Sequence, residues 1–165
     1  MNSLLACCLA AACCCPLYGH AGQDAAPAMP EAPVAAEIAF TPFHYSFVTH
    51  IDDAVLRKVG CTYVVREPAL AARLAALIVA ARDMPQDAVD PKQSFEVRNK
   101  VVLHFTHGPD VALAFSQAFS DVPYLVGTWD GAPIRLRTGL VKQVHELVRD
   151  ARLLQVNAKA SEYCE

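Results

Sequence analysis

The stretch YLVGTWDGAPIRLR, residues 124–137, carries the strongest fold signal in the chain. Asp130-Gly131 separates two runs of β-forming residues, and this pair favours the two-residue type I′ turn of a β-hairpin. After the turn, apolar and basic residues alternate in the order Ile134, Arg135, Leu136 and Arg137. A period of two predicts a strand with one face on a core and the other in solvent. We therefore predict strands over 124–129 and 134–137.

The same alternation extends upstream of the hairpin. In FEVRNKVVLHFT, residues 95–106, one side of the predicted strand collects the apolar residues Phe95, Val97, Val101, Leu103 and Phe105. Residues 107–110, HGPD, have the composition of a turn, and the alternation resumes over 111–119. Two more β-rich runs lie at 43–51 (FHYSFVTHI) and 61–65 (CTYVV). Together these segments predict an antiparallel sheet of four to six strands.

Two long segments have the spacing of amphipathic helices. The first starts at Pro68, a good first-turn residue, and has an apolar stripe of Leu70, Leu74, Leu77, Ile78 and Ala81. The second starts at Thr138, a candidate N-cap, and has an apolar stripe of Leu140, Val144, Leu147, Val148, Ala151 and Leu154. The chain is therefore predicted to be an α+β protein, with two main helices packed on one face of the sheet and the other face at least partly open.

A short third helix is predicted over 54–59. Asp52 and Asp53 precede it as candidate N-cap residues. Gly60 follows it at the position where a left-handed backbone often ends a helix, so a positive φ is expected there.

The first 21 residues have the features of a secretory leader. Residues 3–15 are apolar and uncharged, Pro16 ends the run, and Gly19-His20-Ala21 presents small residues where a signal peptidase cuts. We predict cleavage after Ala21; the alternative is a lipid anchor on Cys13, which ends a loose lipobox. The run is too short to span a bilayer. Residues 22–39, rich in Ala and Pro, are predicted to be a tether, and residues 40–165 a single domain.

Removal of the leader leaves two of the seven cysteines, Cys61 and Cys164. In the oxidising compartment that export implies, two remaining thiols tend to pair, so a disulfide between them is predicted. The alternative is a buried Cys61 and a free thiol on a frayed C-terminus.

Charge and motifs limit the function classes. The chain has 14 basic and 17 acidic side chains, and three of the acids lie in the tether, so residues 40–165 are balanced. A nucleic-acid partner is not expected, because such proteins show a basic excess. We find no nucleophile elbow, phosphate loop or dinucleotide motif, and expect no cofactor. An alternative is a metal-assisted hydrolase using His104 and His107, which would need a third protein ligand.

The outer side of the predicted sheet is the candidate binding surface. Its basic residues are Arg98 and Lys100 on one strand and Arg135 and Arg137 on another, beside small side chains at 112, 114 and 116. Arginines suit carboxylate recognition, and small side chains let a partner approach the backbone. The alternative is an ordinary solvated face, with Glu96 as a local counter-charge.

Two aromatic residues near the hairpin complete the candidate site. Tyr124 and Trp129 are of the types that dominate binding hot spots, although Trp129 fits the core equally well. We therefore expect a small, non-catalytic binding protein that is exported to the periplasm or secreted. Its expected partner is a protein or an anionic envelope component, and an inhibitor or an immunity-type protein would fit this description. The alternatives are the metal-assisted hydrolase above and a lipid-anchored structural protein of the envelope.

Overall fold

A computed structural model describes residue 29, residues 31–42, 50–82, 94–118 and 123–156, and residue 164. Its elements run in the order β1 (Ala35–Phe40), α1 (Asp53–Val59), β2 (Cys61–Val65), α2 (Pro68–Arg82), β3 (Asn99–His104), β4 (Val111–Phe115), β5 (Tyr124–Trp129), β6 (Ala132–Arg137) and α3 (Gly139–Asp150). The leader over 1–21, most of the first part of the tether, and residues 43–49 of the strand predicted over 43–51 lie outside these residues; residues 50 and 51 are described and do not belong to a strand.

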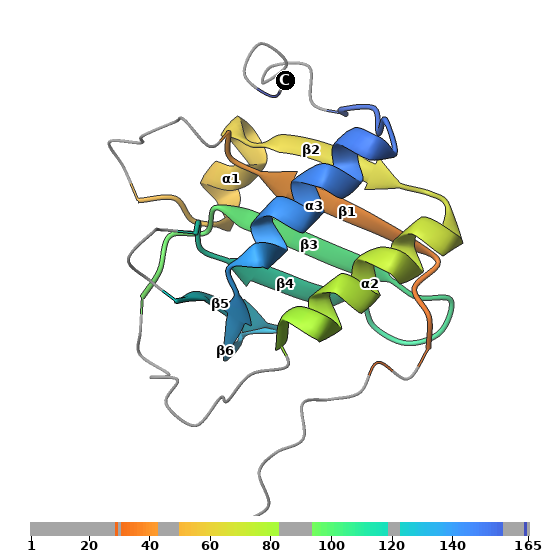
Figure 1. The fold of residues 1–165 in the computed structure, drawn as a ribbon, viewed down its shortest axis with the longest axis horizontal. Helices are drawn as coiled ribbons and strands as arrows, with labels where there is room; N and C mark the ends of the chain where they lie inside the picture. The colour runs from red at the N-terminus through yellow and green to blue at the C-terminus, as the bar shows by residue number, and fades with distance from the viewer. Residues whose placement is uncertain are drawn as a thin grey trace, which may run out of the picture.

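The six strands form one antiparallel sheet with the order β2-β1-β3-β4-β5-β6 (Figure 1). The predicted α+β class, with two main helices on one face, is confirmed. The main core lies between the sheet and the helices α2 and α3, and includes Ile38, Leu74, Phe115 and Leu140, none more than 1% exposed. Among the described residues, no helix is both long enough and apolar enough to span a membrane.

The β5–β6 hairpin is built as the sequence predicts. Asp130 and Gly131 have φ values of 48° and 82°, the two left-handed positions that a type I′ turn requires. The turn is also tied to the neighbouring strand, because the Ala112 amide donates to Oδ1 of Asp130 at 2.7 Å. The turn thereby fixes both the register of the hairpin and its attachment to β4.

β1 corrects the predicted tether, since residues 35–39 belong to the sheet. The strand lies between β2 and β3, pairing Ile38 with Tyr63 on one side and with Val101 on the other. Its alternation is hidden in the sequence because three of its six residues are alanine, a weak strand former. The folded domain therefore begins before residue 40, and the prediction of a tether over 22–39 is wrong for the residues of β1.

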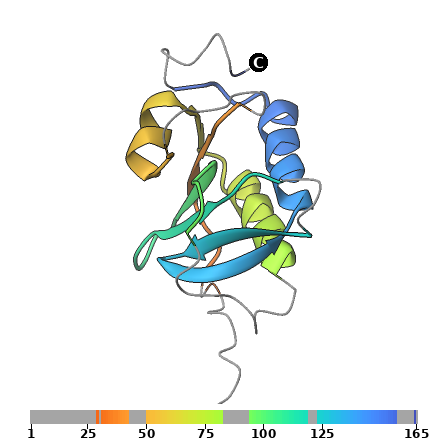
Figure 2. The same ribbon diagram turned by 90° about the vertical axis from the view of Figure 1, so that its left-hand side faces the viewer.

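The short helix α1 packs on the opposite face of the sheet from α2 and α3 (Figure 2). Leu56 and Ile51, both fully buried, contact Ala39 of β1 there and form a second, smaller cluster. The face opposite α2 and α3, called the outer face below, is therefore covered by α1 near β1, and none of the described helices lies on it near β5 and β6.

The ends of α1 agree only in part with the sequence. Asp52 is the N-cap, and its carboxylate accepts from the Val55 amide at 2.8 Å. Gly60, however, has a φ of −80°, so the expected positive φ is wrong. Glycine is required there for a different reason: a Cβ would lie 2.6 Å from the carbonyl oxygen of Leu56.

The last helix is shorter than its apolar stripe suggests. Thr138 occupies the predicted N-cap position, but its side chain makes no cap hydrogen bond. The helix ends at Asp150, because Arg152 adopts a left-handed backbone with φ 50° and the Leu153 amide bonds back to the Val148 carbonyl, as in a Schellman motif. Leu154 consequently lies outside the core, with 85% of its surface exposed.

Candidate binding surfaces

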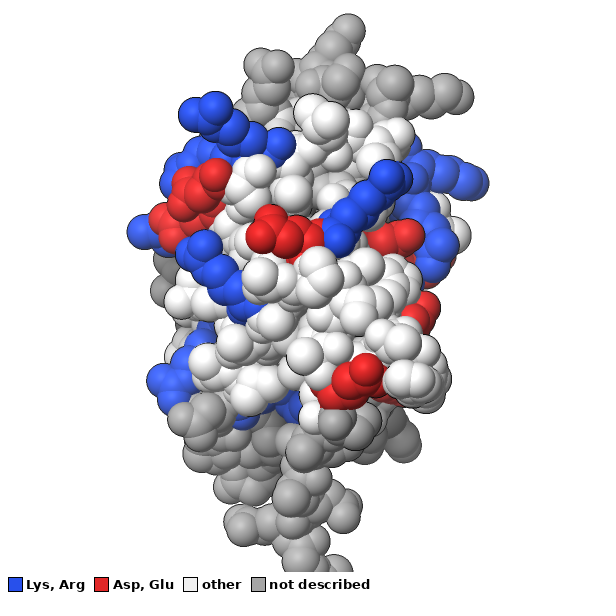
Figure 3. Space-filling view, turned by 90° about the vertical axis from the view of Figure 1, so that its right-hand side faces the viewer, with Lys and Arg blue, Asp and Glu red and all other residues white. Residues whose placement is uncertain are grey.

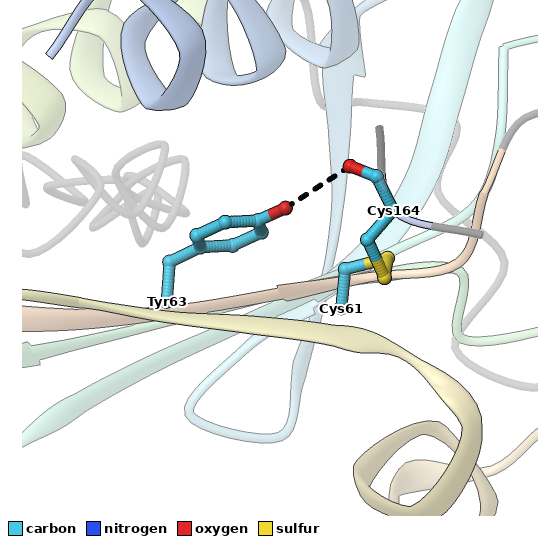
Figure 4. Close-up of a disulfide and its surroundings, with 3 residues drawn as sticks. All are labelled: Cys61, Tyr63 and Cys164. Carbon is cyan, nitrogen blue, oxygen red and sulfur yellow. Dashed lines mark hydrogen bonds between the residues drawn. A yellow bond between two sulfur atoms is a disulfide. The ribbon is translucent and has the colours of Figure 1, made fainter. Parts of the chain in front are cut away.

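The predicted disulfide between Cys61 and Cys164 is confirmed (Figure 4). The two Cα atoms lie 5.6 Å apart across a sequence separation of 103 residues. Cys61 is fully buried on β2, and the Tyr63 hydroxyl donates to the Cys164 carbonyl oxygen at 3.3 Å. The bond therefore fixes the C-terminal end of the chain against β2.

Two of the four predicted basic residues are held in local ion pairs. Arg98 donates through Nε to Glu96 at 2.9 Å, and Lys100 Nζ lies 2.5 Å from Oδ1 of Asp53 on α1. Their side chains are only 11% and 16% exposed, respectively. Glu96 is the counter-charge that the sequence suggested. Arg98 and Lys100 therefore act mainly within the fold.

The ion pair between Lys100 and Asp53 joins α1 to the outer face. Partial burial works to raise the pKa of Asp53, but the hydrogen bond and charge of Lys100, helped by Arg57, hold that pKa below its usual range. The carboxylate is thus charged at neutral pH, and Lys100 serves to attach a helix.

The other two basic residues lie on β6, beside Tyr124 of β5. The guanidinium of Arg135 sits 4.2 Å from the centre of the Tyr124 ring, and Arg137 is the register partner of Tyr124. In the sheet register, Ala114 on β4 and Thr128 on β5 lie between Lys100 on β3 and the strand β6 that carries these arginines. Three strand spacings amount to about 14 Å, so the four basic residues form two groups.

Small side chains cover the sheet between these two groups. Ala112, Ala114 and Thr128 are all half-buried, and Ala114 pairs directly with Thr128. We call Ala112, Ala114, Tyr124, Thr128, Arg135 and Arg137 the docking face. No described helix covers it, and Val126, opposite Arg135 on the same face, is buried among these residues.

Trp129 belongs to the core. Its side chain points to the helix-covered face, it is 4% exposed, and the Arg82 guanidinium lies 4.2 Å from its ring centre. The sequence left two interpretations open for Trp129, a contact residue on the binding surface or a core residue, and the structure shows that it packs in the core.

The two candidate metal ligands face different carboxylates. His104 Nδ1 lies 2.8 Å from Asp110, while His107 Nδ1 lies 3.6 Å from Glu31. Within the part of the chain that the structure describes, no three His, Cys, Asp or Glu residues gather as a metal site would need. Each of the two histidines instead lies next to its own carboxylate.

A groove beside α3 is a feature that the sequence analysis missed. The cavity measures about 740 Å³ and is lined by residues of α3, β1, β2 and the C-terminus, among them Phe40, Tyr63, His145 and Cys164. The His145 ring stacks on Phe40 with centroids 4.0 Å apart, and Phe40 stacks on Tyr63 at 5.4 Å. These aromatic rings come from three elements far apart in the chain.

His145 is electrostatically unusual within this groove. Its Nε2 is buried and has no hydrogen-bond partner among the residues that the structure describes. Burial lowers the pKa of the imidazole below its usual range, so the ring is neutral at pH 7. Burial likewise raises the pKa of the Tyr63 hydroxyl, which stays a hydrogen-bond donor. The groove is therefore apolar and aromatic at its base.

Charges of both signs are mixed on the side of the molecule drawn in Figure 3, with broad uncharged areas between them. Comparison of the chain with protein-family models, with curated proteins and with solved structures finds no match.

Proposed function

We propose that the protein is an exported binding protein that docks an acidic partner protein on the docking face. One observation carries this proposal: beside the Arg135–Tyr124 pair, the outer face presents the small side chains Ala112, Ala114 and Thr128 on β4 and β5, next to the buried Val126.

The arrangement of Arg135 favours recognition of carboxylates. A guanidinium can form two parallel hydrogen bonds with a carboxylate, and that of Arg135 stacks on the Tyr124 ring. Stacking also restricts the side chain before binding, which reduces the entropy lost in the complex. Arg137, directly across from Tyr124, adds a second positive charge to the same corner of the sheet.

The disulfide supports the exported location. Bonds of this kind persist in oxidising compartments and are rare in the cytosol, where thiols are kept reduced. A leader cut after Ala21 would deliver the chain to the periplasm or the medium; acylation of Cys13 is the other route. The intact mass of the mature protein distinguishes the two routes.

The test is capture of a partner from an envelope extract by the purified protein and by the double variant Arg135→Ser/Arg137→Ser. We expect the wild type to retain a protein that the variant loses, and high salt to weaken the capture. The matched control is Arg66→Ser/Arg73→Ser, which removes the same charge elsewhere and should retain the partner. Thermal unfolding of all three proteins checks that each is folded.

Equal recovery by the two double variants would contradict the docking face. Retention of an anionic polymer, rather than a protein, would replace the proposed partner class. If the captured partner is an enzyme, inhibition of its activity by the wild type but not by Arg135→Ser/Arg137→Ser would establish the inhibitor or immunity-type role.

A further inference from the structure

The groove beside α3 has the size and length of a small-molecule site. Its volume of about 740 Å³ lies within the usual range for ligand pockets, roughly 300–1,000 Å³. One wall is a single stripe of α3, with Thr138, Val141, His145 and Val148 at helical spacing. The groove therefore follows the helix, and suits an elongated ligand better than a round one.

The rim of the groove is positively charged. Among the described lining residues, Lys142, Arg149 and Arg152 outnumber the one acid, Glu146. Lys142 is 80% exposed and lies 3.7 Å from Glu146, and Arg149 is similarly exposed beside Asp150. Exposed pairs of this kind contribute little, so the cations can exchange these partners for a ligand anion at small cost.

The base of the groove is apolar and includes an unsatisfied polar atom. Phe40, Tyr63, Val148 and Leu153 line it, so it accepts hydrocarbon. Within the described part of the chain, the buried Nε2 of His145 has no hydrogen-bond partner, and a buried polar group without one calls for an explanation. A small turn of the ring would offer this nitrogen to an acceptor atom bound in the groove.

We propose that the α3 groove binds a fatty acid, with its chain on the apolar base and its carboxylate held at the rim by Arg149 and Arg152. An apolar base with an excess of cations at its edge is complementary to an amphiphile with one negative end. Cys164 lines the same cavity, so the disulfide helps to shape the site. The site lies on the helix-covered side and is independent of the docking face.

The experiment titrates the oxidised, full mature chain with dodecanoate carrying ¹³C at the carboxyl carbon, followed by NMR and by calorimetry. We expect saturable binding with one site and a shift of the His145 ring signals. Methyl dodecanoate, which keeps the chain but lacks the charge, should bind at least about tenfold more weakly, a factor that corresponds to ~1.4 kcal/mol.

Variants separate the charge from the fold. Arg149→Gln/Arg152→Gln should weaken dodecanoate binding at least about tenfold and leave binding of the ester unchanged. The matched control Arg66→Gln/Arg73→Gln removes two arginines outside the groove and should bind like the wild type. His145→Phe keeps a ring stacked on Phe40 but removes the buried nitrogen, and should weaken binding of both the acid and the ester, because each carries an acceptor oxygen.

Several results would overturn the proposal: no saturable binding of dodecanoate up to about 1 mM, equal affinity for acid and ester, or equal affinity in the two arginine double variants. Binding of an acidic peptide that depends on Arg149 and Arg152, in the absence of dodecanoate binding, would replace the fatty acid by a peptide. Either result leaves the capture experiment on the docking face unaffected, so the two proposals fail separately.

Discussion

Removal of the disulfide by Cys61→Ala/Cys164→Ala should cost a large part of the stability expected for a domain of this size. The bond closes a loop with a sequence separation of 103 residues, which spans β2 to α3. The loop-closure entropy for about 100 residues corresponds to ~4.7 kcal/mol at 25 °C, all of it acting on the unfolded chain. Total stabilities of such domains are about 5–15 kcal/mol.

The folded state adds a smaller loss. Without the bond, the Tyr63 hydroxyl loses its fixed acceptor on Cys164, a hydrogen bond worth about 1 kcal/mol. Strain in the native bond, or residual structure in the unfolded chain, would reduce the total. We therefore expect a net loss of about 3–5 kcal/mol.

Urea unfolding followed by circular dichroism measures this loss. For an m-value near 2 kcal/mol per molar, the midpoint should fall by about 2 M, and m should rise because the unfolded chain expands. Wild-type protein reduced with a dithiol is the matched control, and should unfold like the double variant. A loss below about 1 kcal/mol, with m unchanged, would refute the inference that the bond constrains the unfolded chain.

Two further predictions concern single positions. His145 is buried and neutral, and burial lowers the pKa of its imidazole in the folded protein. The free energy of unfolding should therefore be constant above the unfolded pKa near 6.5 and fall as the pH drops from there towards the lower folded pKa, by at most about 1.4 kcal/mol per pH unit. Urea unfolding at several pH values should show this slope, and His145→Phe should reduce it; an unchanged slope would assign it to other groups. Gly60→Ala should destabilise the protein by about 2 kcal/mol or more, because the new Cβ would lie 2.6 Å from the Leu56 carbonyl oxygen. Gly139→Ala is the control: a Cβ at Gly139 would meet nothing within 4 Å, so this substitution should be neutral or stabilising. Equal effects of the two glycine substitutions on the urea midpoint would contradict the close approach.

The hairpin and the main helices were predictable because their signals are local. The Asp130-Gly131 pair adopts the backbone that only a few residue types tolerate, and α2 begins at the Pro68 expected to start it. The alternation of β3 and β6 also places Lys100, Arg135 and Arg137 on the outer face, but the alternation predicted before Asn99 is wrong, because Val97 packs with the cluster under α1 instead of with Val101 and Leu103. Such patterns depend on near neighbours in the chain, which the sequence displays directly.

The rest depends on contacts between distant segments. β1 escaped prediction because its alanines give little strand preference, and its position between β2 and β3 provides the stabilisation instead. The partner of Lys100 could not be foreseen, because Asp53 reaches it only when α1 packs on the outer face. The α3 groove was hidden for the same reason, since Phe40, Tyr63 and His145 meet only through the strand order.

Photo-crosslinking in the native envelope tests the central claim, that the outer face beside β6 binds a partner. A benzoylphenylalanine at Thr128, on the docking face, should form a crosslink to one protein. The same residue at Val79, half-exposed on α2, serves as the control and should form none with that protein. A crosslinked protein specific to position 128 is the predicted result; no product at 128, or the same product from both positions, would contradict the account.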